Sequence, residues 1–123
     1  MLLYGQFIKG IYFMDTKRLI DLIEVKDRYA CAMLDYYISK NITITNALQQ
    51  YIDNMCDEWA MKFIETHKDQ FNDKQVQTEV FRYLNSLGVK QGHTGKRFSE
   101  ALYRQLRKYH TYLNSQEKNQ LSK

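Results

Sequence analysis

The chain has 123 residues, of which 44% are hydrophobic and 14% aromatic, so it can build one folded core and wholesale disorder is excluded. Its charge is uneven: residues 82–123 hold nine bases and two acids, a net of +7, whereas residues 1–81 hold nine bases and twelve acids, a net of −3. A basic C-terminal part behind a mildly acidic body favours a polyanionic partner, and no catalytic signature accompanies it.

The first 14 residues are rich in Leu, Ile, Phe and Tyr, but Gly5, Lys9 and Gly10 interrupt them. They lack the charged start and unbroken apolar middle of a signal peptide, and they are too short to span a bilayer. We expect a short strand or helix packed on the domain, with Met14 as an alternative start of the folded unit. The protein is predicted to be cytoplasmic, with no membrane role.

The next residues predict two long helices. Apolar residues at helical spacing indicate a helix over residues 15–40 with Asp15 as its N-cap, and a break near Lys26-Asp27 is compatible with the pattern. A second helix follows, capped by Thr45 or Asn46. Both cysteines, Cys31 and Cys56, fall at apolar positions of these helices. They are interpreted as reduced, buried thiols rather than a disulfide.

The C-terminal part predicts two more helices joined by a glycine-rich loop. Asp73 can cap the third helix, and Gly88 stands where a left-handed residue often ends a helix. The fourth helix is expected from about Lys96 to Asn114, with residues 116–123 fraying. With no Pro and five Gly, the chain has few helix breakers. We therefore expect one all-α domain over residues 1–123, a compact bundle of about four helices with a basic helix-loop-helix block over 74–114.

The fourth helix is predicted to be apolar on one side and basic on the other. The apolar side is expected to dock on the core through Phe98, Ala101, Leu102, Gln105, Leu106, Tyr109, Tyr112 and Leu113. The other side is expected to point outward and carries five bases, Lys96, Arg97, Arg104, Arg107 and Lys108. Glu100 is the single acid on that side. This arrangement suits nucleic-acid binding, because the electrostatic affinity grows with the number of cations that reach the phosphate backbone together. A solvated basic face is the structural alternative, but this helix offers few acids for i,i+4 pairs.

The loop before that helix reads Gly88-Val89-Lys90-Gln91-Gly92-His93-Thr94-Gly95-Lys96-Arg97. It departs from a Walker loop because Lys90 stands where the motif needs Gly, and Arg97 stands where Ser or Thr would hold magnesium. A plain turn between helices is one interpretation. The favoured one is a loop that lets a nucleic-acid backbone approach, with Lys90, Lys96 and Arg97 around it.

Residues 63–113 resemble the winged-helix tail of phage and plasmid primase-helicases, in which a "Y…LG" helix precedes a polar loop and an "F…L" helix. The matching residues are Phe81, Tyr83, Leu87, Gly88, Phe98, Ser99 and Leu102. The resemblance implies DNA contact through the helix that contains Phe98, in a replication context. Because the chain has no primase or ATPase domain, the implied role is accessory.

Two other readings involve chemistry. Arg104, His110 and Tyr112 form an R-x5-H-x-Y pattern that is similar to the Arg/His signature of HEPN-type RNases, in which Arg and His act on the RNA phosphodiester. This enzyme alternative is disfavoured because the family usually continues through another helix. A metal site from Cys31, Cys56, His67 and His93 lacks the close spacing that zinc ligands prefer. We expect no cofactor and no metal.

Three acids and one aromatic side chain complete the candidate surfaces. Tyr103, at the edge of the basic side, can stack on an unpaired base. Asp53, Asp57 and Glu58 are expected on the outer side of the second helix, as a solvated or protein-docking patch. Trp59 is interpreted as part of the core.

The resulting hypothesis is a small nucleic-acid-binding protein, DNA being favoured over RNA, accessory to replication or transcription in a phage or mobile element. Its predicted contact residues are Lys90, Lys96, Arg97, Tyr103, Arg104, Arg107 and Lys108. The alternative is a helical inhibitor or adaptor that docks on a host protein. Homodimerisation is compatible with both.

Overall fold

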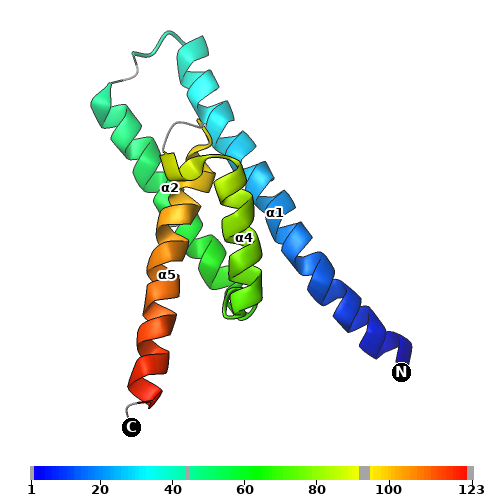
Figure 1. The fold of residues 1–123 in the computed structure, drawn as a ribbon. Helices are drawn as coiled ribbons and strands as arrows, with labels where there is room; N and C mark the ends of the chain where they lie inside the picture. The colour runs from blue at the N-terminus through cyan, green and yellow to red at the C-terminus, as the bar shows by residue number, and fades with distance from the viewer. Residues whose placement is uncertain (1, 44, 92–94, 122–123) are drawn as a thin grey trace.

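The computed structural model describes residues 2–43, 45–91 and 95–121, with side chains over 16–43, 45–91 and 95–118. These described residues form five α-helices and one 3-10 turn, and they contain no strand, so the predicted all-α bundle is confirmed. In chain order the elements are α1 (Leu2–Ser39), α2 (Asn46–Thr66), α3 (Lys68–Phe71), α4 (Lys74–Ser86), η1 (Val89–Gln91) and α5 (Arg97–Leu121) (Figure 1). No described helix is long and apolar enough to cross a membrane.

The helix ends that carry a local signal lie where the sequence predicts them. Thr45 precedes α2 and its hydroxyl accepts a hydrogen bond from the backbone N–H of Leu48 at 3.2 Å. Asp73 caps α4 in the same way, accepting from the N–H of Gln75 at 2.8 Å. Gly88 follows α4 with φ of 79°, a backbone conformation that favours glycine. The side chains of Thr45 and Asp73 thus satisfy N–H groups that the first turns of α2 and α4 leave unpaired, and the backbone N–H of Gly88 donates to the Asn85 carbonyl at the end of α4.

Helix α1 differs from the prediction in its start and in its continuity. It begins at Leu2, so residues 2–14 are the first part of α1 and not a separate element. Asp15 therefore lies inside the helix and does not cap it. It also runs without a break through Lys26-Asp27 and ends at Ser39. A polar pair in an apolar pattern suggested a break. Asp27 is instead a buried residue of the helix, 3% exposed, with partners in α5.

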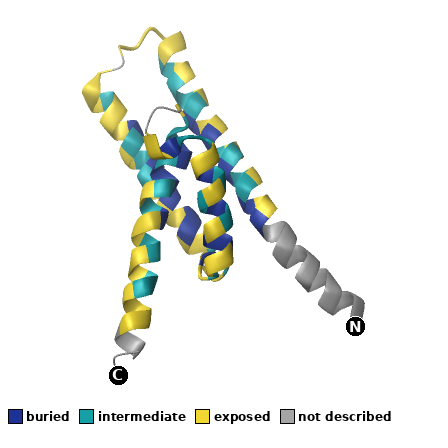
Figure 2. Ribbon diagram, viewed as in Figure 1, coloured by how far each residue is buried: buried dark blue, intermediate teal, exposed yellow. Residues whose placement is uncertain are grey.

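The core lies where α1, α2 and α4 meet the first half of α5. Helix α5 contributes Phe98, Ala101, Leu102 and Leu106, all fully buried, as its predicted apolar side requires. Beyond Leu106 the same side opens to solvent, and Tyr112 is 55% exposed, so its expected burial is wrong. Figure 2 shows this change from buried to exposed along α5. The second half of α5 extends past the elements that could cover it.

The end of α5 is longer than predicted because contacts with α4 and the preceding turn support it. The helix continues to Leu121, through the region expected to fray. Lys74 and Glu117 form an ion pair at 2.8 Å, and the Tyr109 hydroxyl donates to the side-chain carbonyl of Asn72. These contacts tie the exposed half of α5 to the start of α4.

The two cysteines are free thiols with different surroundings. Cys56 in α2 is fully buried, as expected, and burial raises its pKa to about 11, with Asp53 adding to the shift. Cys31 in α1 is half-buried rather than buried. The predicted burial is therefore confirmed for Cys56 and wrong for Cys31.

Candidate nucleic-acid interface

The start of α5 is fixed by an acid from the middle of α1. One Asp27 carboxylate oxygen accepts the backbone N–H of Ser99 at 2.9 Å, and the other accepts the Ser99 hydroxyl. Ser99 is the third residue of α5, so Asp27 supplies from a distant helix the acceptor that an N-cap residue normally supplies locally. Burial raises the pKa of Asp27, although the hydrogen bonds from Ser99 and the charge of Lys96 oppose that rise. The basic helix is thereby anchored at its first turn.

Two of the predicted outward cations form ion pairs with acids of α2, although Arg104 keeps about half of its side chain exposed. Arg97 pairs with Asp53 at 2.7 Å, and Arg104 pairs with Asp57 at 3.0 Å. Gln105 also donates to Asp57, at 3.4 Å. The expectation that Asp53 and Asp57 form a patch on the outer side of α2 is wrong, because both lie at the α2–α5 contact. They supply the acids that α5 itself lacks.

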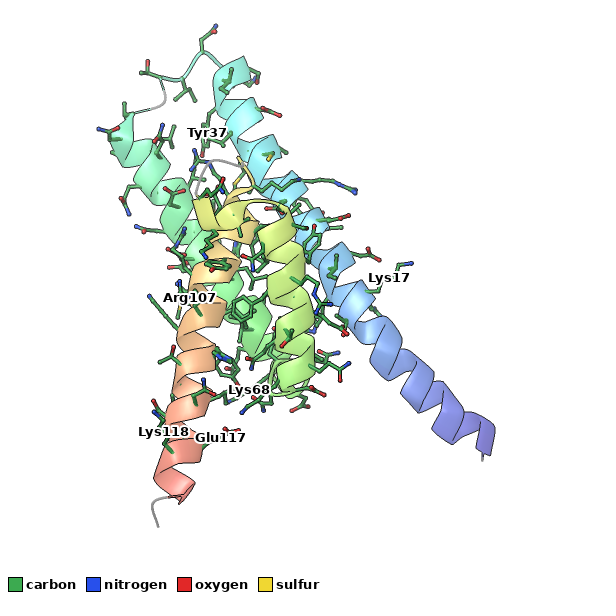
Figure 3. All side chains as sticks on the ribbon, viewed as in Figure 1. Lys17, Tyr37, Lys68, Arg107, Glu117 and Lys118 are labelled. Carbon is green, nitrogen blue, oxygen red and sulfur yellow. The ribbon has the colours of Figure 1, made fainter. Side chains whose placement is uncertain are left out.

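Arg107 and Lys108 remain as an exposed cationic pair on α5. Among the described residues neither forms an ion pair. The Arg107 guanidinium lies over the Tyr103 ring, 5.8 Å from its centroid, and the Tyr103 ring in turn packs edge-on against Phe81. Figure 3 shows Arg107 on the outer side of α5. We call Arg104, Arg107 and Lys108 the outer α5 face, with Arg104 half-exposed beside the two unpaired cations.

A groove of about 460 Å³ lies between α4 and α5, and Phe81, which packs against Tyr103, forms part of its wall. Its lining residues are Gln77, Thr78, Phe81, Arg82, Asn85 and His110. The imidazole of His110 is held between two amides, with Nδ1 2.6 Å from Gln77 Oε1 and Nε2 3.2 Å from Asn114 Nδ2. Exposed Arg82 adds a cation that was absent from the predicted contact residues. Its position on α4 gives no sign of this groove, since only the packing of α4 on α5 forms it.

The three cations of the glycine-rich loop have different surroundings. Lys90 is exposed, Lys96 is half-buried with Asp27 acting on it electrostatically, and Arg97 turns to Asp53. Gly95 has φ of 71°, and a Cβ there would meet nothing within 4 Å, so glycine is favoured by its backbone conformation. Gly92, His93 and Thr94 lie outside the described residues.

The residues predicted for an RNase site or for a metal site do not lie together among the described residues. Arg104 points to Asp57 on α2, whereas His110 points to Gln77 on α4, so the pair that suggested an RNase lies on different sides of α5. Within the described residues no three His, Cys, Asp or Glu side chains gather around a common metal position. The resemblance of residues 63–113 to winged-helix tails stays a prediction.

Comparison of the chain with protein-family models, curated proteins and solved structures gave no match. The contacts of the chain's own residues are therefore the basis for any functional assignment.

Proposed function

We propose that the protein binds nucleic acid, with DNA favoured over RNA, through the outer α5 face and the adjoining α4–α5 groove. The observation that supports this most directly is the exposed pair Arg107 and Lys108, which has no carboxylate partner among the described residues. Both stand on a helix whose first half is buried and whose start is anchored by Asp27. Such cations are available for phosphates without first breaking an internal ion pair.

The arrangement favours phosphate contact over base stacking. Tyr103 has Phe81 against its edge and Arg107 over its face, so a base could stack there only by displacing the guanidinium. Arg82 and His110 line the neighbouring groove, where a second phosphate can be placed beside Arg107. We therefore propose that Tyr103 orients Arg107 through a cation–π contact, in place of the base stacking that the sequence predicts.

The number of available cations predicts weak, salt-dependent binding. Each phosphate neutralised on duplex DNA contributes about −0.9 to the slope of log affinity against log salt. Arg107 and Lys108 alone predict a slope near −1.8, and exchange of Arg104 from Asp57 to a phosphate would take it to about −2.7. A protein with so few phosphate contacts fits an accessory factor of replication or transcription. The small size and the Asn-, Lys-, Tyr- and Ile-rich composition suit a phage or mobile element.

Fluorescence anisotropy with labelled duplex DNA, single-stranded DNA and RNA tests this proposal. Titrations of the full chain from low to physiological salt should give saturable binding that weakens with salt, tightest for duplex DNA. Tighter binding to RNA would keep the surface and correct the choice of nucleic acid. Absence of binding to all three at low salt would refute the proposal.

A second candidate function is protein binding through α1, and a specific surface favours it. Val25, Tyr29 and Tyr36 are 39%, 60% and 57% exposed, and with exposed Ala32 they form a stripe spaced by four, three and four residues. This is the spacing of a helix–helix seam. The stripe lies opposite the buried side of α1, which carries Leu19, Ile23, Asp27 and Ala30.

The charges beside this stripe favour a second copy of the chain as its partner. Arg28 and Asp35 are exposed and two turns apart, too far along one helix to pair with each other. In an antiparallel pair of α1 helices, Arg28 of each copy would lie near Asp35 of the other. Sedimentation equilibrium should show a dimer that Arg28→Asp and Asp35→Arg each weaken and that the double exchange restores. A monomer at high protein concentration would exclude self-association.

A further inference from the structure

The crevice between α1 and α2 combines an apolar floor with a cationic rim. It has a volume of about 250 Å³ and is lined mainly by Leu22, Lys26, Trp59, Lys62, Phe63 and His67. Trp59, expected to be part of the core seam, is only half-buried and turns part of its ring toward this crevice. No residue of the outer α5 face or of the α4–α5 groove lines it. The crevice is therefore separate from the proposed nucleic-acid interface.

The rim is positively charged and contains no carboxylate. Lys26 comes from α1 and Lys62 from α2, and neither takes part in an ion pair among the described residues. The Lys26 ammonium lies over the Trp59 ring, 5.5 Å from the centroid, so it is held at the edge of the apolar floor. Two ammonium groups that form no ion pair among the described residues attract an anion to this position.

The floor is formed by rings with restricted positions. The Phe63 and His67 rings are 4.7 Å apart between centroids, and His67 Nδ1 lies 3.2 Å from the Gln70 side-chain oxygen. Phe63 is also buried against Phe71 and Phe98. Phe63 is only 6% exposed, so the free apolar surface of the crevice belongs mainly to the half-buried Leu22 and Trp59. A flat ligand can pack there by displacing the Lys26 ammonium from the Trp59 ring, without rearranging the core.

We propose that this crevice binds a small planar aromatic ring that carries an acidic group. The ligand ring packs against the exposed part of Trp59, where it displaces the Lys26 ammonium from the indole face. Its acidic group then lies between the ammonium groups of Lys26 and Lys62. A volume of about 250 Å³ is just below the roughly 300–1,000 Å³ of drug-sized ligand sites, so the ligand is one ring system and not an oligonucleotide. An aromatic carboxylate carries its acidic group directly on the ring, and a nucleoside monophosphate carries it through a ribose, so both combine a planar ring with an anion.

Intrinsic fluorescence tests the proposal directly because Trp59 is the single tryptophan of the chain. The full chain is titrated with adenosine monophosphate and benzoate, their uncharged counterparts adenosine and benzyl alcohol, and inorganic phosphate. We expect a saturable change with at least one aromatic anion, and weaker effects from its uncharged counterpart and from phosphate. Which anion binds more tightly then identifies the source of the acidic group.

Matched variants separate the proposed site from a general charge effect. Lys62→Ala should weaken binding of the aromatic anion about three- to five-fold, as expected for an exposed charge pair, and Lys62→Arg should largely retain it. Lys17→Ala is the control, since Lys17 is exposed and points away from the bundle on the outer side of α1 (Figure 3). No saturable change with either anion at millimolar concentration, or equal loss in the Lys17 and Lys62 variants, would overturn the proposal. Neither result bears on nucleic-acid binding by α5.

Discussion

Replacing Asp27 should destabilise the fold more than an ordinary change of a polar residue does. Asp27→Ala removes the acceptor of the Ser99 N–H and hydroxyl, both of which lie in a buried environment. Loss of an N-cap acceptor costs about 1 kcal/mol, and each buried donor left without a partner costs about 1–3 kcal/mol. Relief of the buried charge offsets part of this loss. We therefore expect the free energy of unfolding to fall by about 2–4 kcal/mol, and Ser99→Ala to cost about 1 kcal/mol.

The pH dependence provides a second signature of the buried carboxyl group. Burial raises the folded-state pKa of Asp27 above its ordinary value of 3.8, so the folded state binds this proton more tightly than the unfolded state. The associated stability is complete below pH 3.8 and is lost as the pH rises through the raised pKa. Asp27→Asn keeps the shape but cannot titrate. The wild-type advantage over Asp27→Asn should therefore be larger near pH 4 than at pH 7.

Urea unfolding followed by circular dichroism measures both effects. The three variants are compared with wild type at pH 7, and wild type with Asp27→Asn at a series of lower pH values. A loss below about 0.5 kcal/mol for Asp27→Ala would contradict the role of Asp27 as the anchor of α5, because that is the size expected of ordinary surface changes. A wild-type advantage that grows with rising pH would contradict the direction of the pKa shift.

Three further predictions test the ion pairs, the core and the buried thiol. Asp57→Asn should change the free energy of unfolding by less than about 1 kcal/mol and should increase duplex affinity in anisotropy, because Arg104 is released toward phosphate; weaker binding would contradict this. Leu106→Ala should cost about 2–5 kcal/mol in urea unfolding and Tyr112→Ala less than about 1 kcal/mol, since one is fully buried and the other 55% exposed; equal losses would contradict the core boundary. Cys56, with a pKa of about 11, should resist iodoacetamide in the folded protein at pH 8, as peptide mass analysis can check; rapid alkylation would contradict its burial.

The parts of the fold that were predictable from the sequence have local causes. The Thr45 and Asp73 side chains each accept a hydrogen bond from a backbone N–H within three residues, and Gly88 ends α4 with a positive φ, so the residue types identify these helix ends. The inner side of α5 follows from helical spacing as far as Leu106. Past Leu106 the apolar spacing continues, but no other described helix packs over Tyr112, so the predicted burial of Tyr112 is wrong.

The parts that were not predictable depend on contacts between distant residues. In the sequence, Asp27 is a charged residue within an apolar helical pattern, which suggests a break in the helix. Its burial is explained by Ser99, which is 72 residues away and gives no local signal. Asp57 neutralises Arg104 across 47 residues, so the charge of α5 alone overstates its available cations. For the same reason Arg82 gave no signal, since its groove exists only where α4 packs on α5.

The central claim is that the outer α5 face contacts phosphates, and the salt dependence of duplex binding tests it most directly. Affinity is measured by anisotropy between about 50 and 200 mM salt for wild type, Arg107→Ala/Lys108→Ala, and the control Lys17→Ala/Arg18→Ala, which removes the same charge from exposed positions of α1. We predict that the α5 variant binds more weakly and that its slope is smaller by about 1.8 than that of wild type, while the α1 control keeps the wild-type slope. Equal slopes for wild type and the α5 variant, or equal losses in both variants, would contradict the assignment of the interface to α5.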